Sequence, residues 1–160
     1  MRAWALWYRP ASSANREEAQ RLFERALEID AESVDARIGI ALILAAKIDD
    51  GFSDAIQDDG GRAEKLLSEA LEREPDRSMT HTAKGVLRRA QDRLDEAQAE
   101  LKTAITLDRN NAFAYFLMGS VLMRGGQPEP CIGYVEKALT LSPRETLPYA
   151  QLEHSHNESR

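Results

Sequence analysis

Three histidines and one cysteine are the residues of this chain whose chemistry could support catalysis or metal binding. His154 and His156 form a His-x-His pair in a polar tail, where a flexible segment is favoured over a weak metal site. Cys131 occupies a position that we expect to be small and buried, and a buried thiol is usually inert. No acid, base and nucleophile form a catalytic constellation, and no phosphate-binding loop or dinucleotide fingerprint is present. The sequence therefore predicts no enzyme, no cofactor and no metal site.

An aspartate- and glycine-rich stretch at residues 47–61 is the second candidate for chemistry. Its five aspartates suggest calcium binding. The spacing does not fit the EF-hand loop, which places acidic ligands at fixed alternate positions and a glutamate at its end. We therefore interpret the stretch as a solvated loop in which Phe52 packs against the neighbouring helices.

The chain has 160 residues, a formal net charge of −6 and 42% hydrophobic residues. This apolar content is sufficient for a core, whereas the acidic balance argues against nucleic-acid binding, which needs a basic face. The longest apolar run, Ile38–Ala46, is too short for a membrane span, and the N-terminus lacks the features of a signal peptide. A single cysteine cannot form an intramolecular disulfide. We therefore expect a cytoplasmic protein without a membrane span.

Residues 78–111 and 112–145 align as two blocks of 34 residues. Positions 8, 20, 24 and 27 hold glycine, a small residue, a larger apolar residue and alanine in both blocks: Gly85, Ala97, Leu101 and Ala104, and then Gly119, Cys131, Val135 and Ala138. Positions 20, 24 and 27 share one face of a helix, because four and three residues separate them. The small residues and the glycine would let paired helices approach closely, and the larger residue would fill the gap between adjacent pairs.

The same pattern extends toward the N-terminus, so that a single array spans residues 1–160. Residues 34–77 form a repeat lengthened by about ten residues near 47–61, and residues 1–33 form a partial repeat. Residues 146–160 are expected to form a capping helix and a polar tail. The expected helices are 2–8, 16–29, 34–48, 61–74, 77–90, 94–107, 112–124, 128–141 and 147–154.

This pattern closely resembles the tetratricopeptide repeat (TPR) family, over nearly the whole chain. The resemblance implies an all-α fold, a TPR-type α-solenoid in which antiparallel helix pairs form a right-handed superhelix. The chain departs from the family at position 4, where a large aromatic residue is usual. Tyr115 fits, but His81 and Arg37 stand at this position in other repeats. His81 is therefore expected to pack rather than to act as a general base.

The resemblance also implies a binding surface, because the first helix of each pair lines the concave face of such a superhelix. Ten side chains are expected there: Ile38, Leu42, Met79, Thr82, Val86, Arg89, Phe113, Phe116, Ser120 and Met123. The set lacks the lysine and asparagine with which one class of these repeats holds the carboxylate end of chaperones. We therefore expect a scaffold for a protein or peptide partner. The partner would bind through a helical or extended apolar segment, or would be another copy of the chain.

A narrower resemblance gives an alternative function. Residues 110–119 and 131–139 are similar to TPR arrays attached to bacterial class III adenylate/guanylate cyclases. This implies a regulatory or oligomerisation module of a bacterial signalling protein. Trp4, Trp7 and Tyr8 stand at the start of the array with no repeat before them. Either they pack onto the first long helix, or the chain is cut from a longer protein; left uncovered, they would support self-association.

Overall fold

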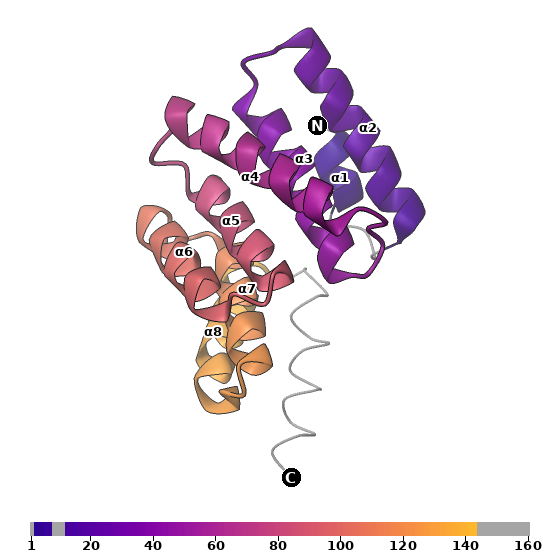
Figure 1. Cartoon of the computed structure of the whole chain (residues 1–160). Helices are drawn as coiled ribbons and strands as arrows, with labels where there is room; N and C mark the ends of the chain where they lie inside the picture. The colour runs from indigo at the N-terminus through magenta and orange to yellow at the C-terminus, as the bar shows by residue number, and fades with distance from the viewer. Residues whose placement is uncertain (1, 8–11, 144–160) are drawn as a thin grey trace. The chain divides into compact units, whose positions relative to one another are not determined.

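The computed structural model describes residues 2–7 and 12–143, and within these residues it contains helices and no strands. The helices belong to two compact units that meet in sequence between Asp76 and Arg77. The first unit contains α1 (Arg2–Trp7), α2 (Ser13–Ile29), α3 (Val34–Asp49) and α4 (Ile56–Arg73) (Figure 1). The second contains α5 (Ser78–Ala90), α6 (Leu94–Leu107), α7 (Ala112–Arg124) and α8 (Pro128–Leu141). The predicted all-α fold of helix pairs is confirmed, and the helix expected at 147–154 lies outside the described residues.

Three helices begin at a polar residue whose side chain accepts a hydrogen bond from the first turn. Ser12 Oγ accepts from the Asn15 amide at 3.2 Å, and α2 consequently begins three residues before the expected position. Ser33 caps α3 in the same way, and Asn111 Oδ1 accepts from the Ala114 amide at 3.0 Å at the start of α7. Such caps satisfy amides that have no partner within the helix.

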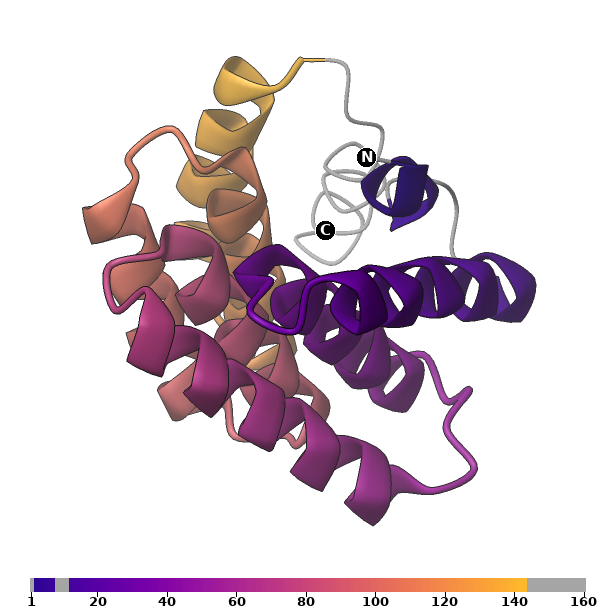
Figure 2. The same ribbon diagram turned by 90° about the horizontal axis from the view of Figure 1, so that it is seen from above.

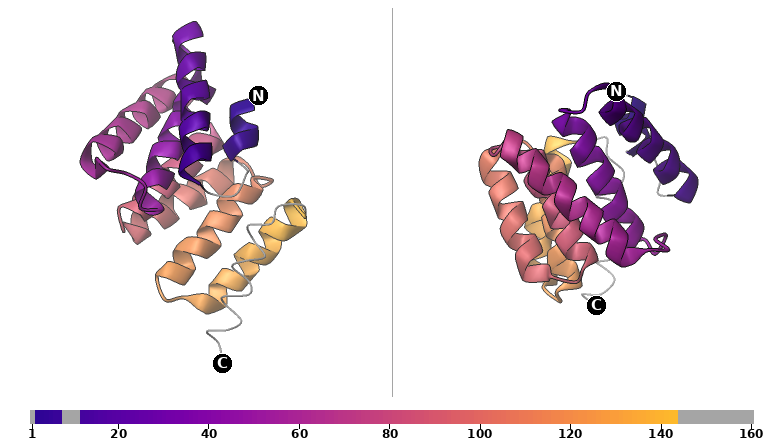
Figure 3. Two further views of the ribbon diagram at one scale, coloured as in Figure 1. Left: turned by 90° about the vertical axis from the view of Figure 1, so that its right-hand side faces the viewer. Right: turned by 45° about the horizontal axis from the view of Figure 1, so that its top comes forward.

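Glycine at position 8 of the repeat brings the two helices of a pair together in the second unit. A Cβ atom on Gly85 would lie 2.7 Å from Cγ of Leu101, and one on Gly119 would lie 2.7 Å from Cγ2 of Val135. Figure 3 shows α7 and α8 side by side in this way. The larger residue was expected to fill the gap between adjacent pairs, and Phe23 of α2 does lie against Gly39 of α3 in the next pair, 2.5 Å from where a Cβ atom would stand; Leu101 and Val135 have a further role. Each of these branched side chains fills the space that glycine leaves within its own pair.

The first helix of each full pair ends with a residue in the left-handed conformation. These residues are Gly51 (φ 74°), Asp92 (φ 59°) and Gly126 (φ 72°), after α3, α5 and α7 respectively. In each case the next amide donates to the carbonyl five residues before it, at 2.7, 2.9 and 2.9 Å. This is the Schellman arrangement, in which the left-handed position favours glycine. Asp92 is the one non-glycine residue with a positive φ in the described part of the chain.

Replacing Asp92 with glycine is expected to raise the free energy of unfolding by about 0.5–1 kcal/mol, because glycine adopts the left-handed conformation without strain. The change also removes a negative charge from the C-terminal end of α5, where the helix dipole disfavours it. The reverse change at the matching turn, Gly126→Asp, should lower the free energy of unfolding. Urea denaturation of both variants measures the two signs, and a destabilised Asp92→Gly would contradict the strain argument.

The N-terminal aromatic residues pack within the first unit. Trp4 meets Phe23 of α2 edge to face, with ring centroids 5.0 Å apart, and the Arg16 guanidinium lies 4.4 Å from the centroid of the Trp7 ring. Trp7 is buried and Trp4 is half-buried. The expected packing of these tryptophans onto α2 is therefore observed. Tyr8 lies outside the described residues.

The additional residues of the repeat at 34–77 lengthen both helices of the pair instead of forming one long loop. α3 has 16 residues where α5 and α7 have 13, and α4 has 18 where α6 and α8 have 14. The connecting loop is therefore limited to residues 50–55. Phe52 in this loop is 41% exposed, so its predicted packing against the helices is wrong. The amides of Phe52 and Ser53 both donate to the Lys47 carbonyl, which fixes the turn on the end of α3.

Candidate functional site

The residues expected to line a binding groove lie in both units and differ in burial. Ile38 and Leu42 lie on α3 in the first unit, and both are fully buried. The other eight lie on α5 and α7, which are in contact in the second unit. Four of these eight are buried: Thr82, Val86, Phe116 and Ser120. The other four are partly exposed, and we call them the α5–α7 face: Met79, Arg89, Phe113 and Met123.

Arg89 joins the two helices of the α5–α7 face. Its Nη1 donates to Ser120 Oγ on α7 at 2.6 Å, and its backbone carbonyl accepts from Arg124 Nη1 at 3.0 Å. Arg89 and Arg124 lie in the last turns of α5 and α7, where the helix dipole favours positive charge. The α5–α7 face thus combines two thioethers and an aromatic ring with a cation in the last turn of α5.

A buried polar network at the start of α7 joins three helices of the second unit. Asn111 Nδ2 donates to Ser78 Oγ at 2.8 Å and to Thr82 Oγ1 at 3.0 Å. Ser78 Oγ donates to the Ala104 carbonyl of α6 at 2.8 Å, and Thr82 Oγ1 donates to the Ser78 carbonyl at 3.0 Å. The Thr82 hydroxyl is therefore engaged within the fold. Sequence analysis did not single out Asn111, although asparagine directly before an apolar helix is a signal for a helix N-cap.

The residue at position 4 of each full repeat contacts a side chain on the second helix of the same repeat. The chemistry of this contact differs between the repeats, and the contacts are Arg37–Glu69, His81–Glu100 and Tyr115–Tyr134. The first pair is a salt bridge of 3.0 Å, and the last is a pair of tilted rings with centroids 6.3 Å apart. His81 is half-buried against α6, in keeping with the packing role expected for it.

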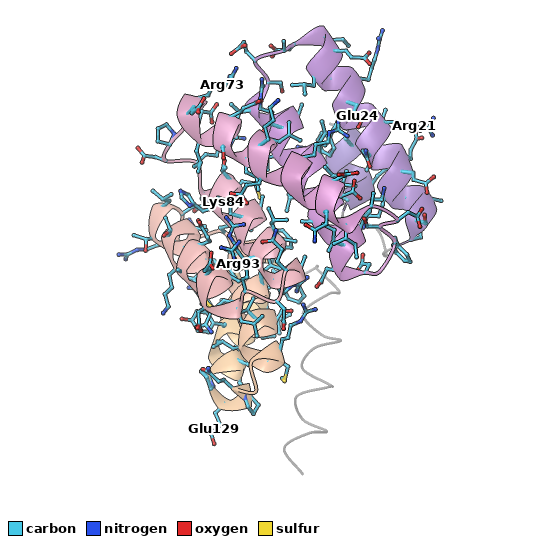
Figure 4. The ribbon with its side chains drawn as sticks, viewed as in Figure 1. Arg21, Glu24, Arg73, Lys84, Arg93 and Glu129 are labelled. Carbon is cyan, nitrogen blue, oxygen red and sulfur yellow. The ribbon has the colours of Figure 1, made fainter. Side chains whose placement is uncertain are left out.

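Glu100 is the charged centre of the α5–α6 pair. Its carboxylate lies 2.8 Å from His81 Nδ1 and 2.9 Å from Lys84 Nζ, which is labelled on α5 in Figure 4. Burial opposes ionisation of this carboxyl, but the hydrogen bonds from His81 and Lys84 outweigh it and hold the pKa of Glu100 below its usual value. The ionised form therefore stabilises the packing of α5 on α6.

The variant Glu100→Gln is expected to lower the free energy of unfolding at neutral pH by about 0.5–1 kcal/mol. The effect is modest because the contacts of Glu100 with His81 and Lys84 are partly exposed. A carboxyl whose pKa is depressed in the folded state stabilises above its unfolded pKa, and this contribution is lost as the pH falls through the folded pKa. The difference from wild type should therefore shrink as the pH falls below the usual pKa of a glutamate and vanish once the pH is below the depressed pKa of Glu100. Urea titrations between neutral and acid pH measure it, and a difference independent of pH would contradict the assignment.

We also considered nucleophilic and metal-binding side chains in the described part of the chain. Cys131 is buried, and burial raises the pKa of its thiol, which supports its interpretation as an inert residue. Within residues 2–7 and 12–143, no group of three or more histidine, cysteine, aspartate or glutamate side chains is placed to hold a metal ion. His154 and His156 lie outside these residues. None of the described helices is long and apolar enough to cross a membrane.

Two segments of the second unit match a known family model. Residues 80–111 and 114–145 each match the model for the tetratricopeptide repeat. These two segments are tetratricopeptide repeats. The two matched segments carry Gly85 and Gly119, the residues that permit the close packing of each helix pair.

The chain is similar to a larger protein. It is 26% identical over 145 residues to the mitochondrial import receptor subunit TOM70 of Mus musculus, a match covering 90% of this chain. The chain spans only 23% of the length of that relative.

Solved structures share the fold of this chain. The APC/C hetero-tetramer Cut9–Hcn1 is 19% identical, with a TM-score of 0.78 over 98% of this chain and 28% of that chain. The first TPR of Spaghetti (RPAP3), bound to the HSP90 peptide SRMEEVD, is 19% identical, with a TM-score of 0.59 over 74% of this chain and 91% of that chain.

Proposed function

We propose that the chain is a protein-interaction scaffold whose α5–α7 face binds an apolar segment of a partner protein. The observation that carries the proposal is the partial exposure of three large apolar side chains on two adjacent helices, Met79, Phe113 and Met123. Flexible thioethers beside an aromatic ring adapt to apolar partners, and aromatic residues are enriched among the anchors of protein interfaces. Arg89 provides a cation for an acidic group on the same segment.

The relatives support a role in protein binding. TOM70 is named as an import receptor subunit, and the RPAP3 domain is bound to the peptide SRMEEVD of HSP90. That peptide contains three acidic residues in its last four positions. The α5–α7 face offers one arginine and no lysine against such a peptide. We therefore propose that its partner presents chiefly apolar side chains, in a helical or extended segment.

A displayed library of random peptides, selected on the full chain, tests this function. The selected peptides are expected to be rich in apolar residues and to lose about tenfold or more in affinity for Phe113→Glu and for Met123→Glu, because a buried carboxylate opposes apolar contact. Phe116→Glu is unsuitable for this purpose, since Phe116 is only 9% exposed and the change would threaten the fold. Thr106→Glu places the same charge on an exposed position of α6 and is the matched control.

Fluorescence anisotropy of the selected peptides measures the affinities, and circular dichroism checks that each variant remains folded. If the peptides bind Phe113→Glu and Met123→Glu as tightly as wild type, the α5–α7 face is not the binding site.

A further inference from the structure

The first unit contains a projecting tip that the second unit lacks. The tip is formed by residues 49–59, where the longer helices α3 and α4 are joined by the loop 50–55. Figure 2 shows this loop extending beyond the ends of the two helices. The matching turns of the second unit contain only residues 91–93 and 125–127. The added residues thus build a surface that the packing of a helix pair does not require.

The tip presents two large apolar side chains to solvent. Phe52 is 41% exposed and Ile56 is 56% exposed, and only Ile29 and Leu107 share this property in the described part of the chain. The turn that carries Phe52 is held in place. The Ser53 hydroxyl donates to Asp59 Oδ2 at 2.7 Å, and two amides donate to the Lys47 carbonyl. Exposed apolar patches rimmed by polar residues mark interaction sites, and Phe52 and Ile56 stand four positions apart in the sequence on either side of the exposed Asp54.

The charges around these two residues indicate what kind of partner fits them. Five aspartates lie between residues 49 and 59, and no lysine or arginine lies between residues 48 and 61. One of the five, Asp50, forms an ion pair of 3.5 Å with Arg16 of α2. Asp54 and Asp58 are exposed. Asp58 and Asp59 stand in the first turn of α4, where negative charge stabilises the helix. That role accounts neither for Asp54 nor for the exposed ring and the exposed isoleucine.

We propose that the tip is a docking site for a basic amphipathic segment of a partner protein. One apolar side chain of the segment would contact Phe52 and Ile56, while lysine or arginine side chains would approach Asp54 and Asp58. Charge complementarity of this kind raises the rate of association and selects the partner. The site is separate from the α5–α7 face and does not depend on it.

To test this proposal, peptides that bind the full chain are selected from a displayed library of random peptides. Peptides that also bind the Phe52→Ser variant are removed by counter-selection. The selected peptides are expected to carry a net positive charge together with apolar residues. Their affinity should fall about tenfold for Phe52→Ser and severalfold for the double variant Asp54→Asn/Asp58→Asn. It should also fall when the salt concentration rises from about 0.05 M to about 0.5 M.

The chain supplies a matched control in Ile29→Ser, which removes an exposed apolar residue of the same unit at the end of α2. This variant and Phe113→Glu should bind the selected peptides as wild type does, so that failure here and failure of the α5–α7 face are distinguishable. Neutral or acidic peptides, equal loss with Ile29→Ser, or no enrichment would overturn the proposal. So would self-association of the wild type that Phe52→Ser abolishes, measured by sedimentation, because the occupant would then be a second copy.

Discussion

Asn111→Asp is expected to lower the free energy of unfolding by about 2–4 kcal/mol, although the two side chains have nearly the same shape. The change keeps the oxygen that caps α7 through the Ala114 amide. It replaces the Nδ2 group, which donates to Ser78 Oγ and Thr82 Oγ1, with a second carboxylate oxygen. The Ser78 and Thr82 hydroxyls already donate to the carbonyls of Ala104 and Ser78, so neither has a hydrogen left for that oxygen.

Two comparisons separate this effect from the loss of a helix cap. Asn111→Ala removes the cap as well as the donor, and a cap is typically worth about 1 kcal/mol. Asn111→Asp retains the cap, and its carboxyl can donate once protonated, so its deficit should shrink in acid while that of Asn111→Ala should not. Asn110→Asp adds the same charge at the exposed neighbouring position and is the matched control. Urea denaturation supplies the free energies, and an Asn111→Asp variant as stable as Asn110→Asp would show that the Nδ2 bonds contribute little.

The helix pairs could be predicted from the sequence because their determinants recur with the repeat. The expected ranges of α6, α7 and α8 are those observed, since each of these helices begins just after a turn and carries the small and large residues at fixed spacing. The observed α2 begins three residues before the expected start at Arg16, because the side chain of Ser12 caps the helix there. Periodic burial thus determines that a helix exists, whereas individual hydrogen bonds determine where it begins.

The extension at 47–61 was the least predictable part of the fold. Aspartate and glycine ordinarily indicate a loop, yet α4 begins at Ile56 and continues through Gly60 and Gly61. Asp58 and Asp59 stand in its first turn, where they stabilise a helix. Gly60 is buried within the first unit. Local composition therefore gave the wrong secondary structure where position within the helix and packing in the unit decided the outcome.

The candidate site was predicted only in part, for a related reason. Position in the repeat predicts which side chains lie on one face of α5 and α7, and four of them form the partly exposed α5–α7 face. It does not predict how deeply each is buried, which depends on all the neighbours. Phe116 and Ser120 belong to the same face by spacing but are buried. The exposure of Phe52 likewise follows from the hydrogen bonds of its turn to the Lys47 carbonyl. Such bonds cannot be predicted from the spacing of apolar residues.

Gly85→Ala is expected to destabilise the wild-type chain but to stabilise a chain in which Leu101 is replaced by alanine. In the wild-type chain the added methyl would lie 2.7 Å from Cγ of Leu101, a fully buried residue, and overpacking of this kind costs about 1–3 kcal/mol. Leu101→Ala alone should cost about 2–5 kcal/mol, because it leaves a cavity between α5 and α6. In that background the methyl enters the cavity, and alanine is favoured over glycine in a helix by about 1 kcal/mol. Gly85→Ala should then stabilise the chain.

The two single variants and the double variant form a thermodynamic cycle with an expected coupling energy of about 2 kcal/mol. Gly133→Ala is the matched control, because Gly133 lies within α8 and a Cβ atom there would have no neighbour within 4 Å. It should stabilise the chain equally in both backgrounds, through helix propensity alone. Urea denaturation of the six chains measures the cycle. A Gly85→Ala effect that is the same with leucine and with alanine at 101 would mean that this contact does not set the spacing of the pair.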